Sequence, residues 1–176
     1  AVIRSRLEPG GILIVDPAMA DDGTLYAGFD TGFVSAMRAL CAGADYILPN
    51  VTEAALLAGL PYCAQLDRAQ AEQLAGGAAA GPEQTVILTG VSFEAGETGA
   101  LLRKNGASRY FGHEKRPSGG FGTGDVFAAA FTGTLLRGAD AETTVRIAAE
   151  YTCRCVKETE THPNHWYGLA FEPVLP

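Results

Sequence analysis

Residues 11–19, GILIVDPAM, form a short apolar run that ends at Asp16 and Pro17. A continuous apolar run of this length is typical of a parallel strand that is buried on both faces of its sheet. DYIL at residues 45–48 and TVILTG at residues 85–90 have the same character. The three stretches therefore predict strands that lie in the interior of the protein.

Helical patterns separate these predicted strands. Apolar side chains recur at helical spacing in residues 30–44, and further helices are expected at 50–59, 66–81, 124–138 and 140–158. Residues 99–113 predict a β-hairpin, because Asn105-Gly106 is a strong two-residue turn signal between strand-like runs. The alternation of strands and helices predicts one α/β domain over residues 1–176, with a mainly parallel sheet.

Composition narrows the classes of partner. The 176 residues are 47% hydrophobic and 19% charged, with 13 basic and 20 acidic side chains and a net charge of −7. This charge disfavours nucleic acid and anionic membrane surfaces as partners, and no apolar run approaches the roughly 20 residues of a membrane span. The four cysteines form no C-x-x-C pair and no secretory signal precedes them, so we expect reduced thiols and a cytoplasmic location.

Polar residues follow each predicted strand. Asp16 ends the first strand, Asn50 and Glu53 follow the second, and Thr89 and Gly90 end the third. Ligands of open α/β sheets bind beyond the carboxyl ends of the strands. These residues therefore predict a ligand site at one edge of the sheet.

The segment GGFGTGDVFAAAFTG, residues 119–133, places Asp125 between a glycine loop and an apolar helix. Gly122 and Gly124 allow the backbone to approach a ligand closely, and the free N–H groups at a helix start form an anion site. Asp125 could accept a proton from an attacking hydroxyl group there. The alternative is that Asp125 only caps the helix or complements its dipole.

Two other acidic motifs also have two interpretations. Asn50 and Glu53 in NVTE have the spacing of a capping box, or Glu53 acts near a Mg²⁺–phosphate complex, directly or through water. Asp16 ends a buried strand, where an ionised side chain needs a partner such as a metal ion. For Asp22, a turn is the favoured interpretation.

Two common nucleotide-binding motifs are missing from the sequence. It has no GxxxxGK[ST] loop, which disfavours an ordinary P-loop NTPase. It also has no GxGxxG that opens a strand–helix unit near a suitable acidic residue, which disfavours a dinucleotide dehydrogenase.

Taken in order, DPAMADDGTLY, ILPNVTEAALLAGL, VILTG and GTGDVFAAAFTG resemble the nucleotide half of the ribokinase-like superfamily, and within it the pyridoxal (pyridoxine, pyridoxamine) kinases. The tail THPNHWYGLAFE is similar to bacterial pyridoxamine kinases. The resemblance implies a three-layer α/β/α sandwich, of which residues 1–176 would be the C-terminal, ATP-binding portion. Such an enzyme would transfer the γ-phosphate of ATP to the hydroxymethyl group of a vitamin B6 vitamer.

The resemblance also implies a role for each matching residue. Asp125 would be the catalytic base, and the amides of Gly122, Thr123 and Gly124 would form the anion hole. Asp16 and Glu53 would act near Mg²⁺. The remaining residues expected at ATP are Asp21, Tyr26, Asn50, Thr89 and Gly90.

The sequence departs from the family pattern in two places. Leu48 stands where the family often has a threonine, which puts a contact to a monovalent cation in doubt. Residues 2–9 look like the end of a helix, and the family's N-terminal portion, with most of the vitamer pocket, is expected to be missing from this chain. A homodimer is expected from the resemblance alone.

Other functions stay open on the sequence. Hydroxymethylpyrimidine kinase, a thiamin-pathway relative, usually has cysteine where Asp125 stands. Sugar and nucleoside kinases of the superfamily more often have Gly-Ala-Gly-Asp at this motif. A regulator that binds nucleotide or vitamer without catalysis would keep the fold, but it would have little reason to keep Asp125.

Overall fold

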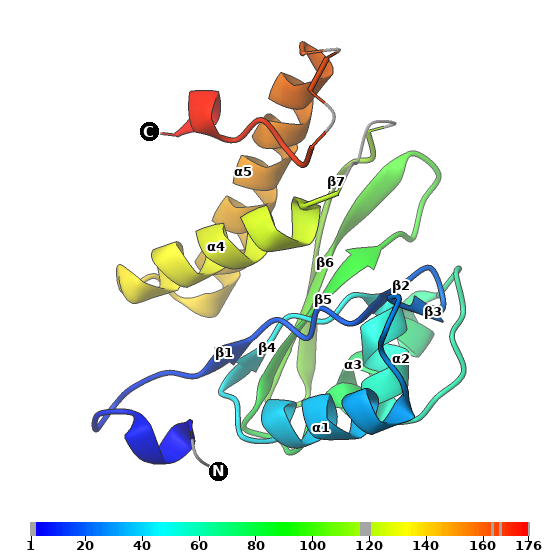
Figure 1. Ribbon diagram of the computed structural model, residues 1–176, viewed down its shortest axis with the longest axis vertical. Coiled ribbons are helices and arrows are strands. Elements are labelled where there is room, and N and C mark those ends of the chain that lie inside the picture. The colour runs from blue at the N-terminus through cyan, green and yellow to red at the C-terminus, as the bar shows by residue number, and fades with distance from the viewer. Residues whose placement is uncertain (1–2, 117–120, 163, 166, 176) are drawn as a thin grey trace.

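The computed structural model describes residues 3–116, 121–162, 164–165 and 167–175 (Figure 1). Within these residues the main sheet has five strands, in the spatial order β1 (Ile14–Val15), β4 (Tyr46–Ile47), β5 (Thr85–Val91), β6 (Glu97–Lys104) and β7 (Ala107–Glu114). Strands β1, β4 and β5 are parallel, whereas β6 and β7 form an antiparallel hairpin at one edge.

Helices cover both faces of this sheet, as Figure 1 shows. One face carries α1 (Thr31–Cys41), α2 (Val51–Ala58) and α3 (Arg68–Ala78), and the other carries α4 (Thr123–Leu136) and α5 (Ala141–Glu160). The expected three-layer α/β/α sandwich is therefore confirmed.

Strand β5 shows why the strands have continuous apolar sequences. Val86 and Leu88 pack in the core under α1, α2 and α3, whereas Ile87 between them packs against α4 and α5. Successive side chains of a strand point to opposite faces, and here both faces are covered. All three residues are fully buried, so a polar residue at any of them would face a dry core.

The predicted hairpin is confirmed at its turn. Asn105 (φ 51°) and Gly106 (φ 78°) join β6 directly to β7, and positive φ at both positions defines a type I′ turn. A second, smaller hairpin joins β2 (Ala20–Asp21) to β3 (Thr24–Leu25). The sequence reasoning predicted only a turn here, although Asp22-Gly23 is also a hairpin signal.

Short 3-10 helices lie near the two ends of the chain. Residues 4–6 form a short 3-10 helix, η1 (Arg4–Arg6), in place of a longer helix end; residue 2 of that prediction lies outside the described residues. The C-terminal segment runs back along α5 to η2 (Glu172–Val174), and the backbone N–H of Ala170 donates to Thr159 Oγ1 at 2.9 Å. Among the described residues, no helix combines the length and the apolar character needed to cross a membrane.

Candidate active site

The residues expected at the site lie at the carboxyl ends of the three parallel strands. Asp16 follows β1, and Asn50, three residues after β4, forms a parallel bridge with Thr89 of β5. The backbone N–H of Thr89 donates to the carbonyl of Pro49 at 2.9 Å. Gly90 follows in left-handed backbone, where β5 has a bulge against β6. The sheet therefore places these four residues along one edge.

Asn50 and Glu53 form a capping box at the start of α2, as one interpretation of NVTE predicted. Asn50 Oδ1 accepts from the N–H of Glu53 at 2.9 Å, and Glu53 Oε2 accepts from the N–H of Asn50 at 2.8 Å. Glu53 Oε1 accepts a further hydrogen bond from the N–H of Met19 at 3.0 Å. Since both oxygens bind backbone and the residue is only 3% exposed, Glu53 holds the segment after β1 against α2.

Burial gives the site two acids with raised pKa values. Burial raises the pKa of Asp16 to about 6, and the nearby charge of Asp125 raises it further in the same direction. Burial raises the pKa of Glu53 to about 7, with a smaller contribution from the charge of Asp16, against its backbone hydrogen bonds. Tyr26 also has a raised pKa, mainly through burial and then through the charges of Asp21 and Glu53. These residues share one acidic environment that favours a cation.

Helix α4 begins beside this acidic cluster. Gly122 is its N-cap, with φ 93°, and within the described residues no side chain caps the first turn. Asp125 lies exposed in that turn, so the structure does not support the interpretation of Asp125 as the helix cap. The N–H groups at the start of α4 remain available to an anion.

The C-terminal segment supports the loop before α4. A Cβ atom at Gly122 would lie 3.6 Å from Gly168 Cα and 3.8 Å from the backbone nitrogen of Leu169. Gly119 and Gly120 of the quoted loop, and Pro163 and Trp166 of the tail motif, lie outside the described residues. The described contacts fix Gly122 between α4 and the tail.

The residues available for a metal ion are few. Among the described residues, no group of three or more His, Cys, Asp or Glu side chains could hold a metal ion by itself. Mg²⁺ often uses one or two carboxylates together with waters and substrate phosphates. Asp16 fits such a site, because its carboxylate is partly buried and next to another negative charge. Leu48 is 3% exposed and packs in the core under α4 and α5, so its side chain offers no ligand.

Sequence reasoning missed one contact at this edge. Thr52, in the first turn of α2, accepts a hydrogen bond at Oγ1 from the N–H of Gly23, at 2.9 Å. Thr52 lies inside the NVTE motif, but the capping-box pattern uses only its first and last residues. The partner lies 29 residues away in the chain, so no local signal could have identified it.

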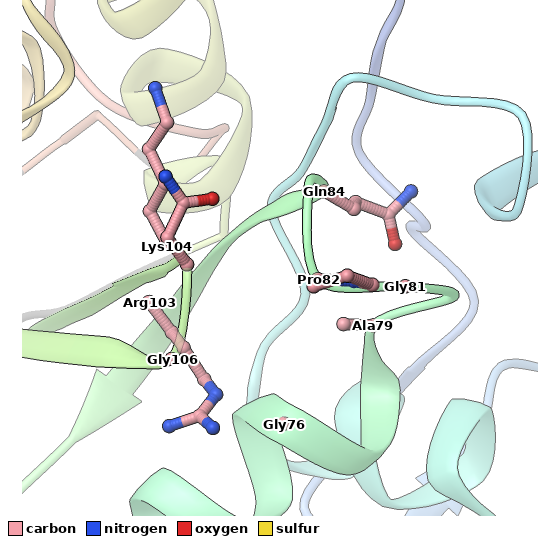
Figure 2. A pocket seen from close by; sticks show the side chains of 9 residues that line it. Gly76, Ala79, Gly81, Pro82, Gln84, Arg103, Lys104 and Gly106 are labelled. Carbon is pink, nitrogen blue, oxygen red and sulfur yellow. The ribbon is translucent and has the colours of Figure 1, made fainter.

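A cavity of about 290 Å³ lies at the opposite end of the sheet, near the start of β5 and the β6–β7 turn. Figure 2 shows that the side chains of Arg103 and Lys104 point away from each other, as neighbours on a strand do. Only Arg103 lies toward α3, and its guanidinium covers Gly76 of that helix. The same guanidinium donates to Ser108 Oγ of β7 at 3.2 Å. This cavity is separate from the acidic edge.

Comparisons with known proteins identify the family and the fold of the chain. The model of the phosphomethylpyrimidine kinase family matches residues 1–170. A pyridoxal kinase from Lactobacillus plantarum superposes with a TM-score of 0.84 at 35% identity, over 93% of this chain and 59% of that one. No curated protein matches the chain.

Two further solved structures are also similar. A Bacteroides thetaiotaomicron protein, provisionally assigned as a phosphomethylpyrimidine kinase, has a TM-score of 0.89 at 28% identity, over 98% of this chain and 60% of that one; another of its crystal forms contains pyridoxal. Pyridoxal kinase from Leishmania donovani, in complex with ADP and pyridoxamine, has a TM-score of 0.74 at 26% identity, over 89% of this chain and 52% of that one.

The chain thus spans about 60% of the length of the first two structures. The family match covers nearly all of its residues, and the solved structures share its layers and sheet. The solved structures that are similar to this chain include pyridoxal kinases. The protein belongs to the phosphomethylpyrimidine kinase family.

Proposed function

We propose that the protein transfers the γ-phosphate of ATP to the 5′-hydroxymethyl group of pyridoxal, pyridoxine or pyridoxamine. The observation that carries this proposal is the start of α4, where the exposed Asp125 shares one helix end with uncapped N–H groups. A base and an anion site in one turn suit phosphoryl transfer, which depends on positioning and on stabilising negative charge. The complex of a structural neighbour with ADP and pyridoxamine supports the choice of substrates.

In this proposal Asp125 accepts the proton of the vitamer hydroxyl as its oxygen attacks the γ-phosphorus. The new O–P bond forms while the bond from the γ-phosphorus to the bridging β–γ oxygen breaks, and ADP leaves with that oxygen. The amides of Gly122, Thr123 and Gly124 stabilise the charge on the transferring group. We place the nucleotide against the strand ends, with the following contacts: Asp21, Tyr26, Asn50, Thr89 and Gly90.

Mg²⁺, when bound with ATP, would offset the negative charge of the phosphates. Asp16 is proposed to hold the ion from the protein side. Glu53, whose oxygens already bind backbone N–H groups, is proposed to act on the ion through water. Since Leu48 offers no side-chain oxygen, we propose no contact from it to a monovalent cation. A cytoplasmic homodimer is the proposed setting.

Hydroxymethylpyrimidine kinase activity is the second candidate, because the family model that matches the chain has the related description phosphomethylpyrimidine kinase. Asp125 favours the vitamer, since the thiamin-pathway relatives usually have cysteine at the corresponding place. The two activities differ only in the alcohol that receives the phosphate.

A panel of alcohols tests the proposal. For the full-length protein, kcat/KM is measured for pyridoxal, pyridoxine, pyridoxamine and hydroxymethylpyrimidine under one set of ATP and Mg²⁺ concentrations. We expect at least one vitamer to exceed hydroxymethylpyrimidine by tenfold or more. The opposite order would assign the protein to the second candidate, and nucleotide binding with no turnover of any alcohol would indicate a regulator.

A further inference from the structure

The β2–β3 hairpin reaches over the start of α2 and carries two of the residues proposed to contact the nucleotide, Asp21 and, directly after β3, Tyr26. Its two strands contribute only two residues each. Such a short hairpin is marginally stable without support from its surroundings. Contacts from outside the hairpin must therefore fix its position.

Side chains from the first turn of α2 supply these contacts. Asn50 Nδ2 donates to the carbonyl of Ala20 at 2.7 Å, and Glu53 Oε1 accepts from the N–H of Met19 at 3.0 Å. Both bonds hold the base of the hairpin. The third bond, from the N–H of Gly23 to Thr52 Oγ1 at 2.9 Å, holds its tip.

The tip is also covered by an aromatic ring. A Cβ atom at Gly23 would lie 2.7 Å from Cδ1 of Tyr62, so the ring lies directly on the glycine. Thr52 is 3% exposed and Tyr62 is 38% exposed. The turn residue Gly23 is therefore held by a buried hydroxyl and by an aromatic ring at the surface.

We infer that Thr52 is a positioning residue for nucleotide binding: its hydroxyl holds the Asp22-Gly23 turn against α2 and so fixes Asp21 and Tyr26 at the nucleotide phosphates. The inference rests on the proposed function for the identity of the ligand. The hydroxyl is needed because valine has the same shape but cannot accept a hydrogen bond. Loss of the acceptor leaves the Gly23 N–H without its partner and frees the turn.

Thr52→Val tests this role, with Thr52→Ser as the variant that keeps the acceptor. Amide hydrogen exchange reports the Gly23 N–H directly, and calorimetry with a non-hydrolysable ATP analogue and Mg²⁺ reports nucleotide binding. We expect exchange at Gly23 to accelerate about tenfold or more in Thr52→Val. The Kd for the analogue and the KM for ATP should rise about five- to tenfold, while kcat changes less than twofold. Thr52→Ser should restore all of these values.

Thr144→Val is the matched control. Thr144 is also buried, and its hydroxyl donates to the carbonyl of Asp140 at 2.7 Å in α5, away from the hairpin. This control should lose stability without any change in Gly23 exchange or in KM for ATP.

Two results would overturn the inference: unchanged Gly23 exchange in Thr52→Val, or an equal rise in Kd and KM in Thr144→Val. If the wild-type protein did not bind the nucleotide analogue at all, the proposed function would fail first. The exchange measurement would still decide whether Thr52 holds the turn.

Discussion

Asp125 does not cap α4, but it stands in the first turn, where an acid complements the helix dipole. It lies exposed in the first turn, and the N-cap is the glycine three residues before it. An acid in a first turn stabilises a helix by about 0.3–1 kcal/mol. Its place beside Asp16, whose pKa it raises, is unfavourable for folding, and we propose that a bound cation offsets the two charges.

Asp125→Asn is expected to keep ATP binding near normal and to reduce the chemical step by about 10²-fold or more, because the amide cannot accept the hydroxyl proton. Single-turnover kinetics measures this step. Asp140→Asn is the control, since Asp140 caps α5 with a bond to Thr143 N–H at 2.8 Å and asparagine caps equally well. Turnover by Asp125→Asn at the wild-type rate would remove Asp125 from the role of base.

Asp16→Asn is expected to stabilise the free protein at pH 8 and to have little effect at pH 4. Burial raises the pKa of Asp16 from 3.8 to about 6, so the folded state binds the proton more tightly than the unfolded state. This contribution to stability is present below pH 4 and is lost as the pH rises through 6. Denaturant titrations of both proteins should show a difference that grows to the order of 2–3 kcal/mol. A difference that does not change with pH would contradict the raised pKa.

At the scale of single residues, the sequence predicted Asp16 as a site residue from its place after a strand and Asp125 from its place at the start of a helix. It could not predict that both oxygens of Glu53 accept backbone hydrogen bonds, because the N–H of Met19 comes from a segment 34 residues away. For the same reason it missed Thr52. Local spacing indicates that a side chain belongs to a motif, whereas its partners depend on how distant segments pack.

The elements around the site combine rigid helix ends with short connecting segments. α2 begins with a capping box, whereas α4 begins with no side-chain cap among the described residues. The two helix ends therefore differ: the start of α2 binds the protein's own backbone, whereas no described side chain binds the N–H groups at the start of α4. This difference supports the assignment of the anion site to α4.

Gly124→Ala tests that assignment at the scale of the element. A Cβ atom at Gly124 would meet nothing within 4 Å, so the free protein should fold normally and gain up to about 1 kcal/mol of helix stability. We expect binding of ATP and turnover to fall about tenfold or more, because the methyl group occupies space where a phosphate must approach.

Gly133→Ala, in the same helix and equally without neighbours within 4 Å, is the control for helix propensity. Thermal unfolding and ATP titrations are compared for both variants. Equal ATP binding and turnover in the two variants would place the phosphate away from the first turn of α4.

The architecture as a whole was predictable because its strands are buried on both faces. Continuous apolar runs, the helices between them and the Asn105-Gly106 turn predicted an α/β class, a mainly parallel sheet and a hairpin, and the family resemblance implied the three layers. Each of these is confirmed. The β2–β3 hairpin was not predicted, because two-residue strands leave no alternating pattern to detect.

The central claim is that this edge of the sheet transfers phosphate to a vitamin B6 vitamer. The most direct measurement is ADP formation by the full-length protein with ATP, with and without a vitamer and with and without Mg²⁺. We expect ADP and the vitamer 5′-phosphate to appear in equal amounts only when both vitamer and Mg²⁺ are present, and at a rate about 10²-fold or more lower in Asp125→Asn. ADP formation that did not depend on the vitamer, or none under any condition, would contradict it.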